Sequence, residues 1–249
     1  MLPCPAALQI GGAWPEVLLL GGIAALLALD ETSFAQTWFG QPLPAALLAG
    51  LCCGDLQTGL LVGLSAQLVV LANVPIGQPF IGDTTTAAIA TVGAVLLGGP
   101  GPLTAGAPLD AIALGRLGWL LIGLMLMSLL GSQVIGAERQ AHMLWMQEGH
   151  RSLRDGSLAR IERLQLRCLL ASLLRGFVML ICYLLLLAEI WLPLGAGLPA
   201  VLLPALAVVP VMAPAVGIGA LVEQYGLQQG ARWLIAGLGV ALLWEVVLG

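Results

Sequence analysis

Long runs of apolar residues constrain the fold of this chain more than any other feature. The run from Ala111 to Gly136 contains one charged residue, Arg116, and Pro199–Val222 contains none. A helix of about 20 apolar residues crosses the hydrocarbon core of a bilayer. Four segments reach or approach that length: Ala111–Gly136, Cys168–Leu192, Pro199–Val222 and Ala231–Leu248. Because 9% of the 249 residues are charged, against about 25% in soluble domains, we predict an all-α integral membrane protein.

The chain before these runs has a different pattern. Trp14–Leu29 is long enough for one helix, which we expect to end at Asp30–Glu31. The apolar pieces that follow are shorter: Leu43–Cys53, Gly59–Ala72 and Ala87–Gly98. Pieces of about 10–14 residues are typical of re-entrant or broken helices, although tilted and kinked spans remain an alternative. We therefore divide the chain into an N-terminal region of broken helices, residues 1–110, and a region of ordinary transmembrane helices, residues 111–249.

Arginine is concentrated between the first two long runs. Six of the nine arginines lie in the polar stretch Ala137–Arg167, and the chain has no lysine. Acidic residues are mixed with them: Glu138, Glu148, Asp155 and Glu162. Because cytoplasmic loops carry an excess of basic residues, we predict that this stretch is cytoplasmic and mainly helical, with a break at Gly149 and a turn at Gly156. This orientation places Asp110 near the outer face of the membrane and Glu223–Gly230 in the cytoplasm.

Apolar side chains would form a stripe on the same stretch: Met143, Leu144, Met146 and Leu153. Charge runs usually form solvated faces, so a solvated face and a docking surface for soluble partners remain alternatives here. No arginine precedes Arg116, so the first apolar run lacks the basic region of a cleavable signal peptide, and we expect it to be retained. The absence of a broad basic patch argues against nucleic acid as a partner.

No catalytic or metal-binding pattern occurs in the sequence. His142 and His150 lie in the polar stretch without a nearby nucleophile or a metal-ligand spacing, and we expect both to be exposed. The five cysteines form no C-x-x-C pair, and we expect them to pack as small apolar residues between helices. The chain also has no glycine-rich loop of the kind that holds nucleotide phosphates. We therefore expect neither an enzyme nor a bound cofactor or metal ion.

Polar residues inside apolar sequence are the candidates for a binding site, because ionisable groups are costly in a membrane and tend to be functional. The candidate substrate-binding residues are Asp30, Glu31, Asp55, Thr58, Gln67, Asp83 and Thr84. Carboxylates, amides and hydroxyls match a neutral polyhydroxylated ligand, whose hydroxyl groups both donate and accept hydrogen bonds. This region has no arginine for an anionic ligand, and the chain has few aromatic residues for a quaternary cation.

Each candidate also has a purely structural interpretation. Asp30–Glu31 would end a helix at the membrane interface, and Asp55 would cap the helix that follows it. Asp83 and the threonines after it would form only the first turn of a helix. Gln67 lies in mid-helix, where no capping role is available, so it faces either a cavity or another helix.

The order of these residues resembles the membrane subunit IIC of the mannose/fructose/sorbose family of bacterial phosphotransferase-system permeases. The resemblance begins with Leu29–Asp30, followed by an acid and Thr32, and continues with Gln41–Leu43. Further matching pairs and turns follow in the same order: Gly54–Asp55, Thr58–Gly59, Val62–Gly63, Pro75–Ile76–Gly77 and Asp83–Thr84. The long runs and the polar stretch match as well, so the resemblance covers nearly the whole chain. Gln67 stands where the family commonly has glutamate, and Gly82 stands where it has proline.

The resemblance implies a multi-pass subunit of the bacterial cytoplasmic (inner) membrane that moves a hexose or amino sugar inward. It also implies an oligomer with a second membrane subunit, IID, and phosphoryl transfer on the soluble subunits IIA and IIB. A regulatory, non-transporting component of an incomplete system is one alternative; an ion- or proton-coupled transporter with Asp30, Asp55 and Asp83 as a relay is another. Under the sugar-permease interpretation, Cys52–Leu68 forms the break and second arm of a re-entrant hairpin that faces the sugar.

Overall fold

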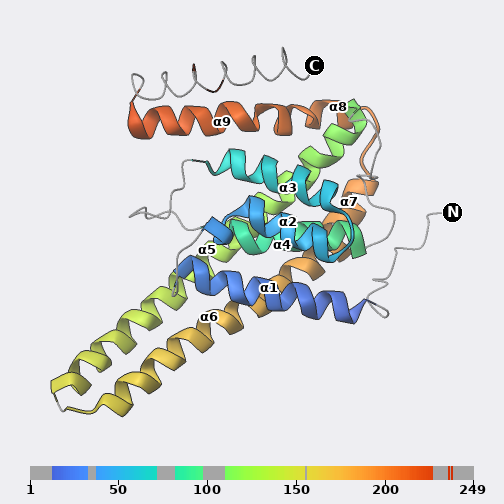
Figure 1. Ribbon diagram of the computed structural model, residues 1–249. Helices are drawn as coiled ribbons and strands as arrows, with labels where there is room; N and C mark the ends of the chain where they lie inside the picture. The colour runs from blue at the N-terminus through green and yellow to red at the C-terminus, as the bar shows by residue number, and fades with distance from the viewer. Residues whose placement is uncertain are drawn as a thin grey trace.

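The computed structural model describes residues 13–32, 38–71, 82–97, 110–154 and 156–226, together with Ile235 and Gly237. These residues lie in helices and turns, and no strand occurs among them. Figure 1 shows short helices gathered in the middle of the molecule and long helices that extend away from them.

The N-terminal region consists of one longer helix and three short ones. Helix α1 spans Trp14–Thr32, which extends slightly past the end predicted at Asp30–Glu31. Helices α2 (Pro42–Cys52), α3 (Leu56–Val69) and α4 (Thr84–Leu97) have 11, 14 and 14 residues. At about 1.5 Å per residue they are shorter than the hydrocarbon core of about 30 Å. Their placement as re-entrant helices in the bilayer remains a prediction, and Pro75–Ile76–Gly77 lies outside the described residues.

Three helical segments in the described residues are long and apolar enough to cross a membrane. The first is α5 (Ala111–Arg154). The second, Leu158–Ala196, comprises α6 (Leu158–Leu186), the π-helix η3 (Leu187–Trp191) and α7 (Leu192–Ala196). The third, Leu203–Glu223, comprises the one-turn helix α8 (Leu203–Leu206) and most of α9 (Val208–Tyr225). The prediction of an all-α membrane protein is therefore confirmed. Apart from Ile235 and Gly237, the run Ala231–Leu248 lies outside the described residues.

Helix α5 corrects the predicted organisation of the polar stretch. It continues without a break through Gly149 for 44 residues, or about 66 Å, and the chain turns only at Gly156, where φ is 68°. A glycine costs a helix interior only about 1 kcal/mol, and no proline follows to end the helix. The apolar and polar parts of α5 are therefore one continuous helix.

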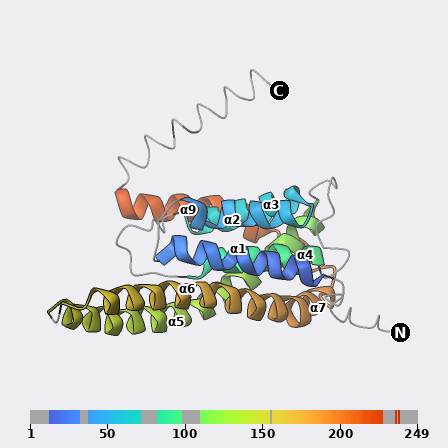
Figure 2. The same ribbon diagram turned by 60° about the horizontal axis from the view of Figure 1, so that its bottom comes forward.

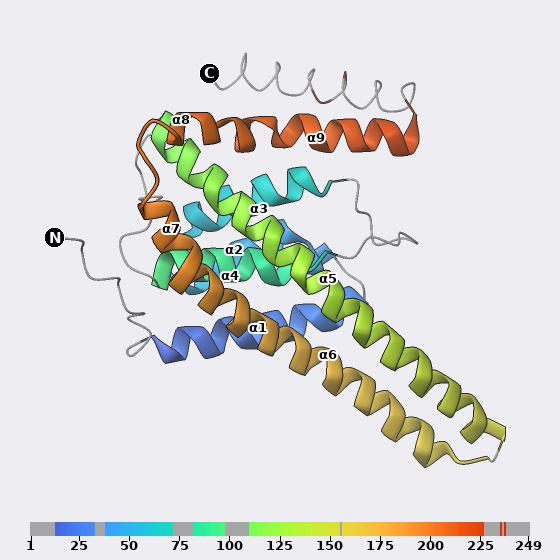
Figure 3. The same cartoon turned by 180° about the vertical axis from the view of Figure 1, so that it is seen from behind.

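Helices α5 and α6 run side by side, and their far ends project beyond all the other described helices (Figures 1 and 3). We call residues 137–167 the projecting hairpin. An ion pair of 3.0 Å joins Arg160 to Glu148 across it, and the guanidinium of Arg167 lies 4.5 Å from the ring centroid of Trp145. The view in Figure 2 separates α2, α3 and α9 from α5 and α6, with α1 and α4 between them. Helix α4 is the centre of the core, because its residues from Thr84 to Val95 are all buried.

Glycine allows α2 and α3 to form a close antiparallel pair. The chain reverses at Gly54, whose φ of 81° favours glycine. A Cβ atom on Gly50 would lie 2.6 Å from the carbonyl oxygen of Asp55 and 3.0 Å from Cα of Gly59. The two backbones therefore pack directly against each other, as small residues allow in membrane helices.

A pair of tryptophans joins α5 to the π-helix η3. The rings of Trp119 and Trp191 stack with their centroids 4.2 Å apart and their planes 9° from parallel. The indole N–H of each donates to the backbone carbonyl of the other, at 3.1 Å from Trp119 and 3.0 Å from Trp191. Each tryptophan precedes a glycine by four residues, and Gly123 and Gly195 each lie against the opposite indole. Two W-x-x-x-G segments thus hold the helices together at the end opposite the projecting hairpin.

Candidate functional site

Gly40 is the point where three elements of the N-terminal region meet. It ends the 3₁₀ helix η2 (Trp38–Gly40). Its N–H donates to Oδ2 of Asp30 at the end of α1, over 2.8 Å. Its carbonyl accepts a buried hydrogen bond of 2.6 Å from the hydroxyl of Thr85 in the first turn of α4. We call this arrangement of Asp30, Gly40 and Thr85 the Gly40 junction.

Gln67 lies beside this junction and joins α3 to the start of α2. Its Nε2 donates to Oε1 of Gln41 over 3.3 Å, and its Oε1 accepts from the N–H of Leu43 over 3.4 Å. The first N–H groups of a helix lack partners within the helix, and Gln67 supplies one from a neighbouring helix. Of the two interpretations left open by the sequence, the structure therefore shows an interhelical contact for Gln67. Gln41 directly follows Gly40 in the chain, so the half-buried amides of Gln41 and Gln67 lie beside the Gly40 junction.

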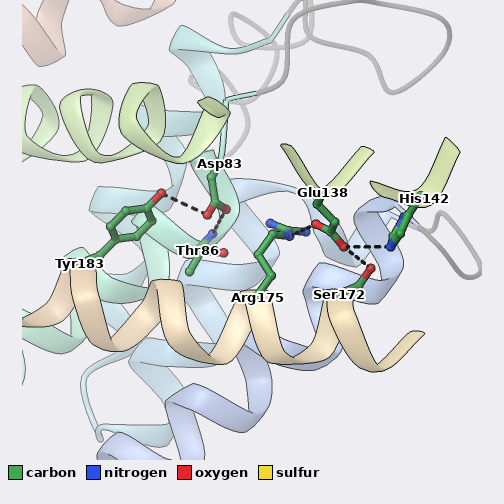
Figure 4. A network of polar contacts seen from close by, with 7 residues as sticks. All are labelled: Asp83, Thr86, Glu138, His142, Ser172, Arg175 and Tyr183. Carbon is green, nitrogen blue, oxygen red and sulfur yellow. Dashed lines mark hydrogen bonds and ion pairs between the residues drawn. The ribbon is translucent and has the colours of Figure 1, made fainter. Parts of the chain in front are cut away.

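Asp83 is fully buried at the start of α4. Its Oδ1 accepts from the N–H of Thr86 at 3.3 Å, and its Oδ2 accepts from the hydroxyl of Tyr183 in α6 at 3.2 Å. Its own N–H donates to the carbonyl of Ser128 in α5, over 3.2 Å. Asp83 therefore caps α4 and fixes its first turn, which includes the buried Thr84, against both long helices (Figure 4).

Figure 4 shows a second carboxylate in the same polar network, and its position corrects a prediction. Glu138 belongs to the stretch predicted to be solvated, yet its side chain is only 8% exposed and forms an ion pair with Arg175 of α6. It also accepts a hydrogen bond of 2.5 Å from Ser172, and Nε2 of His142 lies 3.6 Å from its Oε1. His142 is therefore partly buried rather than exposed as predicted, because its ring lies against Glu138 and Trp145 of the same helix. His150 is exposed.

Asp55 and Thr58 lie at the other end of α3. The N–H of Thr58 donates to Oδ1 of Asp55 over 3.1 Å, and the Thr58 hydroxyl donates to Oδ2 over 2.7 Å. The two residues form the helix cap that was the structural alternative for Asp55. Gln67 is twelve residues further on, or about 18 Å along the helix. The predicted site residues therefore fall into two groups; the side chain of Glu31 lies outside the described part of the structure.

The chain matches the family model described as the sorbose-specific IIC component of the phosphotransferase system over residues 14–248. It belongs to this family of IIC proteins. The resemblance seen in the sequence is thereby confirmed, and the chain is a membrane component of a sugar-transport system.

Two solved structures are similar to this IIC chain. One, described as the structure of a membrane protein, has a TM-score of 0.72 at 17% identity, covering 92% of this chain and 86% of that chain. The other is a cryo-electron microscopy structure of the mannose transporter ManYZ in complex with microcin E492, with a TM-score of 0.46 at 16% identity, covering 95% of this chain and 88% of that chain. No curated protein matches. The first likeness shows that the IIC chain shares its fold with another membrane protein.

The chemistry of the site in this IIC protein is that of hydrogen bonding. The Gly40 junction and the Gln41–Gln67 pair present carboxylate, hydroxyl and amide groups from four helices and η2. Within the described ranges, no three histidine, cysteine or acidic side chains gather as metal ligands. Sequence reasoning did not find Arg175, Glu138 or Tyr183 as network members. The sequence feature that could have indicated this network is Arg175, the lone arginine inside the apolar run Cys168–Leu192.

Proposed function

We propose that this IIC protein carries a neutral hexose or amino sugar inward across the bacterial cytoplasmic membrane, and that the sugar binds beside the Gly40 junction. The observation that carries this proposal is the meeting of Asp30, Gln41, Gln67 and Thr85 where the ends of α1, η2, α2, α3 and α4 come together. Interrupted helices are the usual place for a transporter's binding site, because their ends leave backbone groups for a ligand.

The amides at this site suit a ligand that both donates and accepts. Each glutamine amide offers two donor hydrogens and an oxygen with two acceptor positions. The two hydrogen bonds of Gln67 use one donor and one acceptor position. The remaining capacity allows the same side chain to bind a sugar hydroxyl while it holds the start of α2. Family membership supports a sugar as the cargo, since the family is named for a sugar-specific component.

The proposal includes partner subunits. We expect the membrane subunit IID to pack beside this chain, as the resemblance implies, and the soluble IIA and IIB subunits to act from the cytoplasm. The projecting hairpin is the surface we assign to the soluble subunits. Several apolar residues of this hairpin are more than half exposed: Met143, Leu144, Met146, Leu153, Leu158 and Leu166. Apolar side chains beside exposed arginines suit a protein partner with an acidic rim.

Titration of sugars onto the purified complex with IID tests the proposed cargo and its site together. We expect saturable binding of a hexose or amino sugar by the wild-type protein and a loss of affinity on replacing Gln67 by leucine. Gln133→Leu is the matched control, because it removes the same amide from an exposed position in α5. Absence of binding to every hexose and amino sugar tested would contradict the proposed cargo. Equal affinities for the two leucine variants would instead contradict the proposed site.

Measurements of coupling separate this proposal from its alternatives. A proton-coupled carrier would take up sugar with a proton gradient and no phosphoryl donor. A regulatory component would bind its partner subunits without transporting. The proposed permease subunit is expected to transport only when IID and the phosphorylated soluble subunits are present in the same vesicles.

A further inference from the structure

Arg175 lies between two buried carboxylates, and its two neighbours have different surroundings. On one side it forms the ion pair with Glu138, and its other side lies toward Asp83, as Figure 4 shows. The side chain of Arg175 is 4% exposed, and Asp83 is fully buried. Charged groups are costly in such surroundings unless they are paired, so the position of each depends on the others.

The two carboxylates do not depend equally on this cation. Glu138 also accepts from Ser172 and lies near His142, whose ring can carry a positive charge. Asp83 accepts hydrogen bonds from the neutral groups of Thr86 and Tyr183, and the cation that lies toward it in Figure 4 is Arg175. Loss of Arg175 would therefore disturb Asp83 more than Glu138.

Asp83 in turn connects to the proposed sugar site through the first turn of α4. The same turn contains Thr85, whose hydroxyl binds the carbonyl of Gly40, and Gly40 binds Asp30. Movement of Asp83 would shift Thr85 and loosen the Gly40 junction. Hydrogen bonds join Asp83 to Tyr183 at one end of this connection and Thr85 to Gly40 at the other. One turn of helix links Asp83 to Thr85.

We propose that Arg175 is a positioning residue for the sugar site: its charge holds Asp83, and Asp83 holds the first turn of α4 against the Gly40 junction. This inference rests on the proposed function for its effect on sugar, while its effect on α4 is independent of any ligand. The competing role is a simple link between α5 and α6 through Glu138. In the proposed role the important neighbour of Arg175 is Asp83, and in the competing role it is Glu138.

Hydrogen exchange of the complex with IID distinguishes the two roles, because the amide of Thr86 donates to the carboxylate of Asp83 and the amide of Ala87 donates to its backbone carbonyl. We compare E138Q with R175M/E138Q, since both lack the ion pair between α5 and α6 and only the second also lacks the charge beside Asp83. We expect about tenfold faster exchange at the start of α4 in the double variant, as a buried charge loses its partner, and exchange close to wild type in E138Q. The amide of Thr58, which Asp55 caps in the same way, is the internal control and is expected to be unchanged.

Sugar affinity is measured on the same variants. We expect R175M/E138Q to bind sugar about tenfold more weakly than E138Q, with partial recovery in R175K/E138Q, because lysine keeps the charge without the forked donors of arginine. Equal exchange and equal affinity in E138Q and R175M/E138Q would overturn the proposal in favour of the simple link. If R175M/E138Q does not accumulate, R175Q/E138Q takes its place, because glutamine also removes the charge, and exchange and affinity equal to those of E138Q there would overturn the proposal. If the wild type binds no sugar, the proposed function fails, and exchange at α4 still decides the role of Arg175.

Discussion

Replacing Gly123 by alanine tests the packing of the tryptophan pair. A Cβ atom at this position would lie 2.6 Å from Cδ1 and 2.8 Å from Cε2 of Trp191. Carbon atoms in contact are normally about 3.5–4.0 Å apart, so the indole of Trp191 has to move by about 1 Å. That movement disturbs the stacking with Trp119 and the hydrogen bond from the Trp191 indole to the Trp119 carbonyl.

The free-energy terms for Gly123→Ala point in opposite directions. Overpacking costs about 1–3 kcal/mol. Loosened stacking costs about 0.5–1.5 kcal/mol, and a weakened hydrogen bond costs about the same. Alanine gains about 1 kcal/mol over glycine in a helix interior. Because the unfavourable terms describe one displacement and overlap, we expect a net loss of about 2–3 kcal/mol in the free energy of unfolding.

Gly136→Ala is the matched control for this substitution. Gly136 lies in the same helix, and a Cβ atom there would meet no other atom within 4 Å. We expect it to be neutral or to stabilise the protein by up to about 1 kcal/mol. Denaturation of both variants in the same detergent gives the difference, and the circular dichroism of the stacked indoles reports on the pair itself. Equal stability of the two variants, with unchanged indole signals, would refute the reasoning.

Three further substitutions test the site and the projecting hairpin. Gln67→Leu leaves the N–H of Leu43 without its acceptor, so we expect destabilisation of about 1–3 kcal/mol in denaturation experiments. We also expect this variant to lose sugar affinity by about tenfold. Gln67→Glu keeps the acceptor and is expected to bind sugar. Asp55→Ala removes a helix cap and is expected to cost about 0.5–2 kcal/mol of stability. In titrations, the sugar affinity of Asp55→Ala is expected to fall less than that of Gln67→Leu. An equal loss of affinity would indicate that Asp55 belongs to the sugar site. Leu144→Glu is expected to weaken binding of soluble IIB in a pull-down, while Gln133→Glu, at an exposed position of the same helix outside the projecting hairpin, leaves it unchanged; equal binding by both would contradict the docking surface.

The helices of the N-terminal region follow closely from the sequence because their boundaries are set by local chemistry. Gly54 supplies the left-handed turn between α2 and α3, and the side chain of Asp55 caps the helix after it. Helix α5 was harder to predict, since glycine at position 149 has only a small cost that its neighbours in a long helix outweigh. Local rules thus give the position of a break where the chain needs a special backbone conformation, and fail where two outcomes differ by about 1 kcal/mol.

The polar network between α4, α5 and α6 could not be predicted for a different reason. Glu138 and Arg175 are far apart along the chain, and their pairing depends on how α5 and α6 pack. Periodicity shows which residues share a face of a helix, but not which faces meet. The same applies to the tryptophan pair, whose two W-x-x-x-G segments are visible in the sequence only as separate patterns.

Two helix caps with one sequence pattern show how far surroundings change the role of a residue. Asp55 begins D-x-x-T at α3 and Asp83 begins D-x-x-T at α4, and each accepts from the N–H three residues later. Asp55 is partly exposed beside a turn, where water and the N-terminal end of the helix dipole are enough to balance its charge. Asp83 is fully buried, where a charge has to be balanced by another group, and Arg175 is the cation that lies toward it in Figure 4. The pattern alone predicts the cap in both cases. Burial is what ties the position of the second cap to a residue in another helix.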